Sequence, residues 1–284
     1  MKLPCAAPLP RLFGLLVLGA AFLTGCATTP ATDPATMSAL DTILAGEHRV
    51  PEHRARDAYR HPKETLQFFG IRRDMTVVEV WPGAGWYTEI LGPLLRDHGQ
   101  LYAALLDPAS GDYARNTVET YRGKLALRPD LYGKVITTTL AAPTARGGSE
   151  IAPPGSADLV LTFRNLHNWM MFGWEREAFA AMHAALKPGG VLGVVGHRGD
   201  PTLPQDPKAA SGYVREDHAI RSIEAAGFRL LARSEINANA KDTKNYDEGV
   251  WTLPPGFADG DQARYQRIGE SDRFTLKFVK VEAP

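Results

Sequence analysis

The sequence predicts an α/β fold built on a doubly wound, mostly parallel sheet of seven strands. Two observations carry this prediction. Short runs rich in β-branched residues alternate with amphipathic helical runs, which is typical of a parallel sheet covered on both faces. The last two apolar runs have no helix-length apolar repeat between them, so we expect an antiparallel pair that closes the sheet.

Each expected strand is a short apolar or β-branched segment bounded by turn residues. The seven segments are Thr76–Val80, Leu101–Leu106, Val135–Thr139, Asp158–Phe163, Val191–Val195, Arg229–Ile236 and Arg273–Val281. Large apolar side chains at helical spacing predict three helices between them, over Trp86–Arg96, Glu175–Leu186 and Glu216–Ala226. Gly227 follows the last of these, in the position where glycine commonly ends a helix.

Length and composition exclude several classes of protein. The chain has 284 residues, 44% of them hydrophobic and 23% charged, which suits one soluble domain of ordinary size or two small ones. Basic and acidic residues both number 32, so no basic surplus points to a nucleic-acid partner. The 2 cysteines exclude a disulfide-stapled scaffold and a four-cysteine zinc site, and the histidine spacing predicts no metal site.

The first 25 residues have the features of a secretion signal. Lys2 and Arg11 precede the uncharged apolar run Leu12–Leu23, which is shorter than the roughly 18–20 residues that span a bilayer. The segment Leu23-Thr24-Gly25-Cys26 resembles the bacterial lipobox, in which the cysteine is lipidated and becomes the mature N-terminus. This resemblance implies a signal peptide over residues 1–25 and a lipid on Cys26. The alternative is an ordinary signal peptide with a chance cysteine.

The same resemblance implies a location in the cell envelope. Ala27 stands where lipoproteins retained in the inner membrane typically carry aspartate, so we expect an outer-membrane anchor with the protein facing the periplasm. Residues 26–36 are mostly small and polar and contain proline, which predicts a flexible tether. The folded domain is then expected over residues 37–284.

A glycine-rich turn follows the first expected strand. Residues 77–88 (VVEVWPGAGWYT) resemble the first motif of class I S-adenosylmethionine-dependent methyltransferases, which have a Rossmann-like fold. Further resemblances follow in the family's order, in residues 158–167 (DLVLTFRNLH), in residues 186–190 (LKPGG) and in the last strand pair. Residues 81–88 (WPGAGWYT) and 166–169 (LHNW) resemble, more narrowly, a group of predicted methyltransferases of that family.

The resemblance implies that this turn binds S-adenosylmethionine. Gly83 and Gly85 would let a bulky cofactor approach the backbone. Glu79 would hold the cofactor's ammonium group, and Tyr87 would form a wall of the pocket. The alternative is a plain strand-to-helix turn. A dinucleotide site is disfavoured because Thr88 replaces the third glycine of Gly-x-Gly-x-x-Gly.

Two acids that the resemblance leads us to expect are shifted or missing. The family's second strand usually ends in an acid that binds the ribose; that position is Leu105, and we assign the role to Asp107. Residues 137–144 contain no acid to contact the adenine. Charge-assisted hydrogen bonds are worth about 1.5–3 kcal/mol each, so we expect weakened cofactor binding.

Polar residues after the fourth expected strand are the candidates for catalysis. His167 is the acid–base candidate because an imidazole titrates near neutral pH. Asn165 and Asn168 would orient the methyl acceptor by hydrogen bonds. The alternative for His167 is a structural histidine bonded to a backbone carbonyl.

An arginine-rich segment precedes the first strand. Arg56 and Arg60 are four residues apart and would share a helical face, where they are expected to bind an anionic group of the substrate. The alternative is a solvated face on which they pair with Glu52 and Asp57.

Together these features predict a membrane-anchored methyltransferase that acts on a small molecule. The expected location opposes this prediction, because S-adenosylmethionine is a cytosolic metabolite. A lipoprotein that kept the fold, lost the chemistry and binds a small molecule in the periplasm is therefore the second hypothesis. A structural envelope protein would need a surface interaction stripe, and the sequence contains none.

Overall fold

The structure, a computed structural model, describes residues 33–143 and 149–281 together with Met1. The described residues from 33 onward form one compact unit. The predicted signal peptide beyond Met1, the predicted lipidation site Cys26 and the tether up to residue 32 lie outside the described residues. Helix α1 begins at Pro34, inside the segment expected to be a tether, and the Asp33 carboxylate accepts hydrogen bonds from the first amides of that helix.

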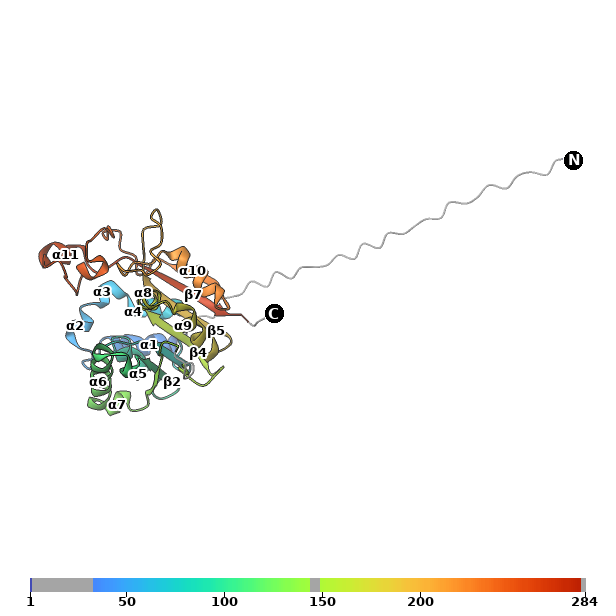
Figure 1. Cartoon of the computed structure of the whole chain (residues 1–284). Helices are drawn as coiled ribbons and strands as arrows, with labels where there is room; N and C mark the ends of the chain where they lie inside the picture. The colour runs from blue at the N-terminus through green and yellow to red at the C-terminus, as the bar shows by residue number, and fades with distance from the viewer. Residues whose placement is uncertain (2–32, 144–148, 282–284) are drawn as a thin grey trace. The chain divides into compact units, whose positions relative to one another are not determined.

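Seven strands form a single sheet in the order β3-β2-β1-β4-β5-β7-β6. Strands β2, β4, β5 and β7 of this sheet are labelled in Figure 1. They are β1 (Thr76–Val80), β2 (Gln100–Leu105), β3 (Ile136–Thr139), β4 (Ala157–Phe163), β5 (Leu186–His197), β6 (Phe228–Ser234) and β7 (Arg273–Lys280). The first five are parallel, and β7 runs antiparallel to both of its neighbours, β5 and β6. The predicted fold class, with its C-terminal antiparallel pair, is confirmed.

Helices connect the strands and cover the sheet. Those before β1 are α1 (Pro34–Leu44), α2 (Pro51–Arg54), α3 (Asp57–Arg60) and α4 (Pro62–Phe69). Those that follow are α5 (Thr88–Leu95), α6 (Asp112–Leu127), α7 (Pro129–Tyr132), α8 (Leu166–Phe172), α9 (Glu175–Ala185), α10 (Glu216–Ala225) and α11 (Gln262–Ile268), with short 3-10 turns at Pro108–Ser110 and Gly249–Thr252. No helix in the described residues combines the length and apolar character that crossing a membrane requires.

Two of these elements start two or more residues away from the predicted position. Helix α5 starts at Thr88 rather than Trp86, because residues 83–87 form a series of turns after β1. Strand β5 starts at Leu186, so residues 187–190, expected to be a turn before the strand, are part of it. The pairing register of β4 and β5 shifts between Ala157 and Leu159, which absorbs this irregular start as a bulge.

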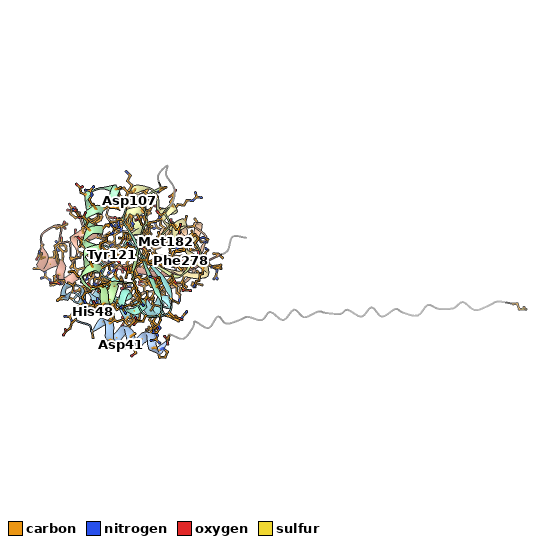
Figure 2. The ribbon with its side chains drawn as sticks, turned by 90° about the horizontal axis from the view of Figure 1, so that it is seen from below. Asp41, His48, Asp107, Tyr121, Met182 and Phe278 are labelled. Atoms are coloured by element: carbon orange, nitrogen blue, oxygen red, sulfur yellow. The ribbon has the colours of Figure 1, made fainter. Side chains whose placement is uncertain are left out.

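The core lies on both faces of the sheet, as alternation along its strands requires. In β1, Val77 packs with the group formed by α1, α4 and α5, whereas Val78 and Val80 pack with that of α8, α9 and α10. Figure 2 shows Met182 of α9 and Phe278 of β7 inside the domain, and both are fully buried. Helix α6 makes a separate, smaller contact with β2 through Val118 and Tyr121.

The topology brings several chain segments to one edge of the sheet. The strand order reverses between β1 and β4, and ligands of such sheets bind outside the carboxyl ends of the strands at this point. Because β7 is antiparallel, its first residue, Arg273, pairs with His197, the last residue of β5. The residues just before β7 therefore lie at the same edge as the ends of the parallel strands.

The packing of β7 into the core predicts a large loss of stability when one of its buried side chains is removed. Phe278→Ala removes a fully buried ring and should lower the free energy of unfolding by about 3–5 kcal/mol. Phe172→Ala is the matched control, because that ring, at the end of α8, is 71% exposed and should matter by no more than about 0.5 kcal/mol. Urea unfolding followed by circular dichroism measures both; similar losses would contradict the buried placement of β7.

Candidate functional site

A cavity of about 440 Å³ lies at the carboxyl ends of β1, β4 and β5. Its volume is in the range of small-molecule sites. The lining contains many of the residues expected from sequence, namely Arg56, Arg60, Glu79, Gly83, Tyr87, Asn165, His167 and Asn168. Gly85 and Asp107, also expected there, do not line it.

The two glycines after β1 differ in their surroundings. Gly83 has φ +58, and a Cβ added to it would meet no atom within 4 Å, so the space beside it is open to the cavity. Gly85 has φ +79, and a Cβ there would lie 3.2 Å from the Tyr121 ring of α6. Gly85 thus serves helix packing. Trp81, at the start of this turn, is also left-handed with φ +49 although it is not a glycine.

Glu79 is a buried carboxylate beside this open space. The Thr88 hydroxyl donates a hydrogen bond of 2.6 Å to its Oε2. Burial raises the pKa of Glu79 to about 7, although the Thr88 hydrogen bond and the Lys124 ammonium both act to lower it. A cationic group placed in the cavity against Glu79 would favour its charged form.

Aromatic rings form one wall of the cavity. Tyr87 stacks on Phe163 with ring centroids 3.5 Å apart and planes inclined by 10°. Trp86 lies next to Tyr87, and its ring packs against the Arg60 guanidinium at 4.7 Å from the ring centroid. The Trp86 indole N–H donates to the backbone carbonyl of His53, which joins α2 to this wall.

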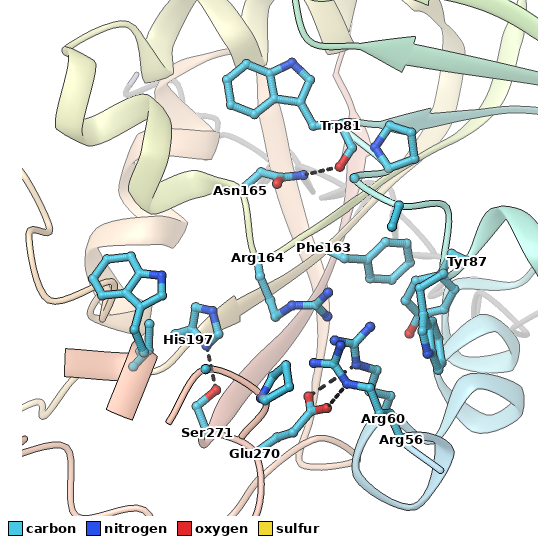
Figure 3. A pocket seen from close by; sticks show the side chains of 18 of the residues that line it. Arg56, Arg60, Trp81, Tyr87, Phe163, Arg164, Asn165, His197, Glu270 and Ser271 are labelled. Carbon is cyan, nitrogen blue, oxygen red and sulfur yellow. Dashed lines mark hydrogen bonds and ion pairs between the residues drawn. The ribbon is translucent and has the colours of Figure 1, made fainter. Parts of the chain in front are cut away.

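A single carboxylate in the cavity lining forms ion pairs with three arginines. Glu270 accepts hydrogen bonds from Arg56 Nε at 2.5 Å and from Arg60 Nε at 3.2 Å (Figure 3). It also accepts one from Arg273 Nη1 at 2.9 Å. Burial acts to raise the pKa of Glu270, but these arginines together with Arg164 lower it to about 2. Arg56 and Arg60 therefore pair with a residue far along the chain, and neither pairs with Glu52 or Asp57 in the described residues.

Arg164 directly follows β4 and extends into the cavity. Its backbone is left-handed, with φ +64, and its amide donates to the Val195 carbonyl of β5. Figure 3 shows its side chain directed toward Glu270, Arg56 and Arg60. Burial, and then Arg273, lower the pKa of Arg164 to about 10.

Two histidines lie together at the ends of β4 and β5. The rings of His167 and His197 have centroids 5.5 Å apart, and the Nδ1 atom of His197 is 2.6 Å from the Ser271 hydroxyl (Figure 3). Burial, and then Arg164, lower the pKa of His167 to about 4. Burial, His167 and Arg164 likewise hold the pKa of His197 well below its usual value. Both rings are therefore neutral at pH 7, and His167 is a weak base.

The two asparagines after β4 have different surroundings. The Asn165 amide group donates to the Val80 carbonyl at 2.9 Å and to the Thr162 hydroxyl at 3.1 Å, which ties the ends of β1 and β4 together. This arrangement favours a positioning role for Asn165. Asn168 lies in the first turn of α8 and lines the cavity.

The residues present fit the amino-acid end of S-adenosylmethionine better than its adenosine end. Glu79 and the open space at Gly83 suit the ammonium group and its approach. Asp107 instead caps a 3-10 turn by accepting a hydrogen bond from the Ala109 amide, and it lies outside the lining of the cavity. Glu79 and Glu270 are the carboxylates that line the cavity as far as the described residues define it.

Several lining residues were not singled out from sequence, namely His53, Arg164, His197, Trp251, Glu270 and Ser271. Arg164 directly follows the predicted fourth strand, and His197 lies two residues after the predicted end of the fifth, a position that indicates a ligand site in this type of sheet. Glu270 has no comparable signal, because its partners lie 210 and 214 residues away in sequence.

No metal centre accompanies the cavity within the described ranges. In residues 33–143 and 149–281, no group of three or more histidine, cysteine or acidic side chains is arranged to hold a metal ion.

Comparison with known proteins shows the fold. The chain matches no protein-family model, and no curated protein matches it in sequence. Among solved structures it is similar to a SAM-dependent methyltransferase from Aquifex aeolicus, with TM-score 0.53 and 17% identity over 88% of this chain and 99% of that one. It is also similar to the [4+2]-cyclase SpnF, with TM-score 0.55 and 16% identity over 87% of this chain and 93% of that one. The chain thus has the Rossmann-like methyltransferase fold. Since one of these similar structures is a cyclase, the fold alone does not determine the reaction.

The raised pKa of Glu79 predicts a specific pH dependence of stability. An unfolded Glu79 ionises near 4.5 and the folded one near 7, so between these values the folded state binds more protons and stability falls as pH rises. Wild-type protein should therefore lose about 3 kcal/mol more than Glu79→Gln between pH 4 and pH 8. Urea unfolding at several pH values measures this difference, and parallel curves for the two proteins would contradict it.

Proposed function

We propose that the protein is an S-adenosylmethionine-dependent methyltransferase acting on a small molecule. The observation that carries the proposal is the buried carboxylate of Glu79 beside the open space at Gly83, at the point where the strand order reverses. The methyltransferase fold supports it, because the site lies where sheets of this type bind their ligands.

The residues at the end of β1 account for binding of the cofactor's amino-acid end. Glu79 binds the ammonium group, and pairing with that cation offsets the cost of keeping a buried carboxylate charged. The stacked pair Tyr87 and Phe163 presents a rigid apolar wall that excludes water from the cavity. When bound, the cofactor supplies a methyl group already activated as a sulfonium, so the protein has mainly to orient the acceptor.

The residues at the ends of β4 and β5 act on the acceptor. His167 is neutral at pH 7 and makes no side-chain hydrogen bond in the described residues. Its ring can therefore accept a hydrogen bond from a hydroxyl or amine of the molecule that is methylated. Its low pKa makes proton removal by His167 inefficient unless the cavity changes on binding. We assign it to orienting the acceptor, with Asn168 beside it.

A second function, binding without methyl transfer, is favoured by one observation. The Asp107 carboxylate caps a 3-10 turn and does not line the cavity. The cavity lining also includes no residue from 134 to 143, the segment that contains β3. A ligand without a ribose would need neither contact. A measurement of cofactor binding distinguishes the two functions, because only the methyltransferase is required to bind S-adenosylmethionine.

For location, we propose a lipid anchor at Cys26 and residence at the outer membrane, facing the periplasm. The proposal is supported by the lipobox-like segment Leu23-Thr24-Gly25-Cys26 and by Ala27 after it. It requires that cofactor reach the envelope or that the ligand be another molecule.

Calorimetric titration of S-adenosylhomocysteine into the detergent-purified chain tests the cofactor site. We expect a micromolar dissociation constant for the wild type. Gly83→Val should weaken binding at least about tenfold, because its side chain would occupy the open space at the end of β1, where an added Cβ meets no protein atom within 4 Å.

Gly155→Val is the matched control for backbone strain. Gly155 also has a positive φ, +65, and open space at its Cβ, but it does not line the cavity. Its binding should equal that of the wild type. Absence of wild-type binding at millimolar ligand would overturn the methyltransferase proposal and favour the binding lipoprotein. Equal weakening by both valines would show that strain, and not occupation of the cavity, is responsible.

The anchor is tested in a bacterial host by membrane fractionation. Wild-type protein should be found in the outer-membrane fraction and incorporate labelled palmitate, because Cys26 is the proposed acyl acceptor. Cys26→Ala should lose the label and leave the membrane fraction. Cys5→Ala, which alters the other cysteine, should behave as the wild type. Labelling of the Cys26→Ala protein would overturn the assignment.

A further inference from the structure

The cavity has an excess of positive charge on the side of the N-terminal helices. Three arginines line it, Arg56, Arg60 and Arg164, and a fourth, Arg273, lies buried behind them. One carboxylate, Glu270, stands among these four guanidinium groups. The histidines at the ends of β4 and β5 add nothing to this charge, since their lowered pKa values leave both rings neutral at pH 7.

Glu270 is fully occupied by three of the four arginines. Its two oxygens accept from Arg56 and Arg60, at 2.5 and 3.2 Å, and from Arg273 at 2.9 Å. Arg273 is satisfied further by the backbone carbonyls of Tyr59 and Ser271. These contacts fix the cluster as part of the fold.

Arg164 is the exception in this cluster. Its side chain makes no hydrogen bond and no ion pair within 4.0 Å to any described residue. It is held in place from its backbone, between the end of β4 and Val195 of β5, and it is directed into the cavity (Figure 3). A guanidinium presents up to five donors in a planar fork that matches a carboxylate or a phosphate.

We infer that the methyl acceptor carries a carboxylate or phosphate, and that Arg164 binds this group. The inference rests on the proposed function, because it names the substrate class of the same cavity. The anion would supply the partner that Arg164 lacks, and Glu270 would not repel it, since that carboxylate is already neutralised by its own arginines.

Anion binding at Arg164 also bears on the histidine beside it. The Arg164 guanidinium is one of the two causes that lower the pKa of His167. An anion paired with this guanidinium would offset its charge and make His167 a better base while the acceptor is bound. Binding of the methyl acceptor would thus raise the basicity of His167, the residue that orients it.

The test uses the full chain in detergent with inorganic phosphate and with succinate as the two probes. Thermal unfolding is followed as each probe is added against sodium chloride of equal ionic strength. We expect at least one probe to raise the midpoint, and the probe that does so identifies the anion class. Arg164→Gln should raise the half-saturating concentration about tenfold, because a charge-assisted pair is lost. Arg164→Lys should give an intermediate value, because it keeps the charge but not the fork.

Arg54→Gln is the matched control, since Arg54 is exposed on α2 and does not line the cavity. It should respond to the probes as the wild type does. Absence of a shift with both probes, or equal shifts in Arg164→Gln and wild type, would overturn the inference.

Titration of S-adenosylhomocysteine into the same variants keeps this result separate from the proposed function. Arg164→Gln should bind it within about twofold of the wild type. Anion binding without cofactor binding would refute the methyltransferase proposal and leave the anion site in place, and the reverse result would refute the anion site alone.

Discussion

The carboxylate of Glu270 joins the two ends of the folded domain, and the cavity depends on it. Its arginine partners are Arg56 and Arg60, which precede it by 214 and 210 residues, and Arg273, the first residue of β7. Glu270, Arg60 and Arg273 are buried, and a buried charge without a partner is strongly destabilising. The ion-pair group therefore fixes the N-terminal helices over the edge of the sheet, where they close one side of the cavity.

The cavity is divided between two kinds of chemistry. Near the end of β1 the cavity is lined by the Glu79 carboxylate, by Gly83 with open space beside it, and by stacked aromatic rings. Near the start of β7 it offers guanidinium groups and neutral imidazoles. A site that joins two reactants needs such a division, because each half then orients one of them.

Local sequence patterns predicted the sheet well because its strands are short, apolar and β-branched, as β1 shows with TVVEV. Helix α6 escaped prediction because its buried stripe is narrow: Ala114, Val118 and Tyr121 are buried while most of its other residues are exposed or half-buried. Residues at strand ends, such as Glu79 and His167, could be placed in the cavity because topology brings strand ends together. The pairing of Glu270 with Arg60 could not be predicted, because no local pattern encodes a partner so distant in the chain.

Two residues with left-handed backbones, Trp81 and Arg164, follow the neighbouring strands β1 and β4. Glycine at either position would relieve about 1–2 kcal/mol of steric conflict, and it would also delete the indole or the guanidinium. At Trp81 this gain would be outweighed, because the indole packs against Trp169 and Trp174 and donates to the Leu140 carbonyl. The Arg164 guanidinium has no such partner among the described residues. In a protein evolved in the laboratory for heat resistance, without a requirement for its activity, Arg164 would therefore be replaced while Trp81 is retained, so loss of the arginine under such selection would mark it as a side chain kept for function.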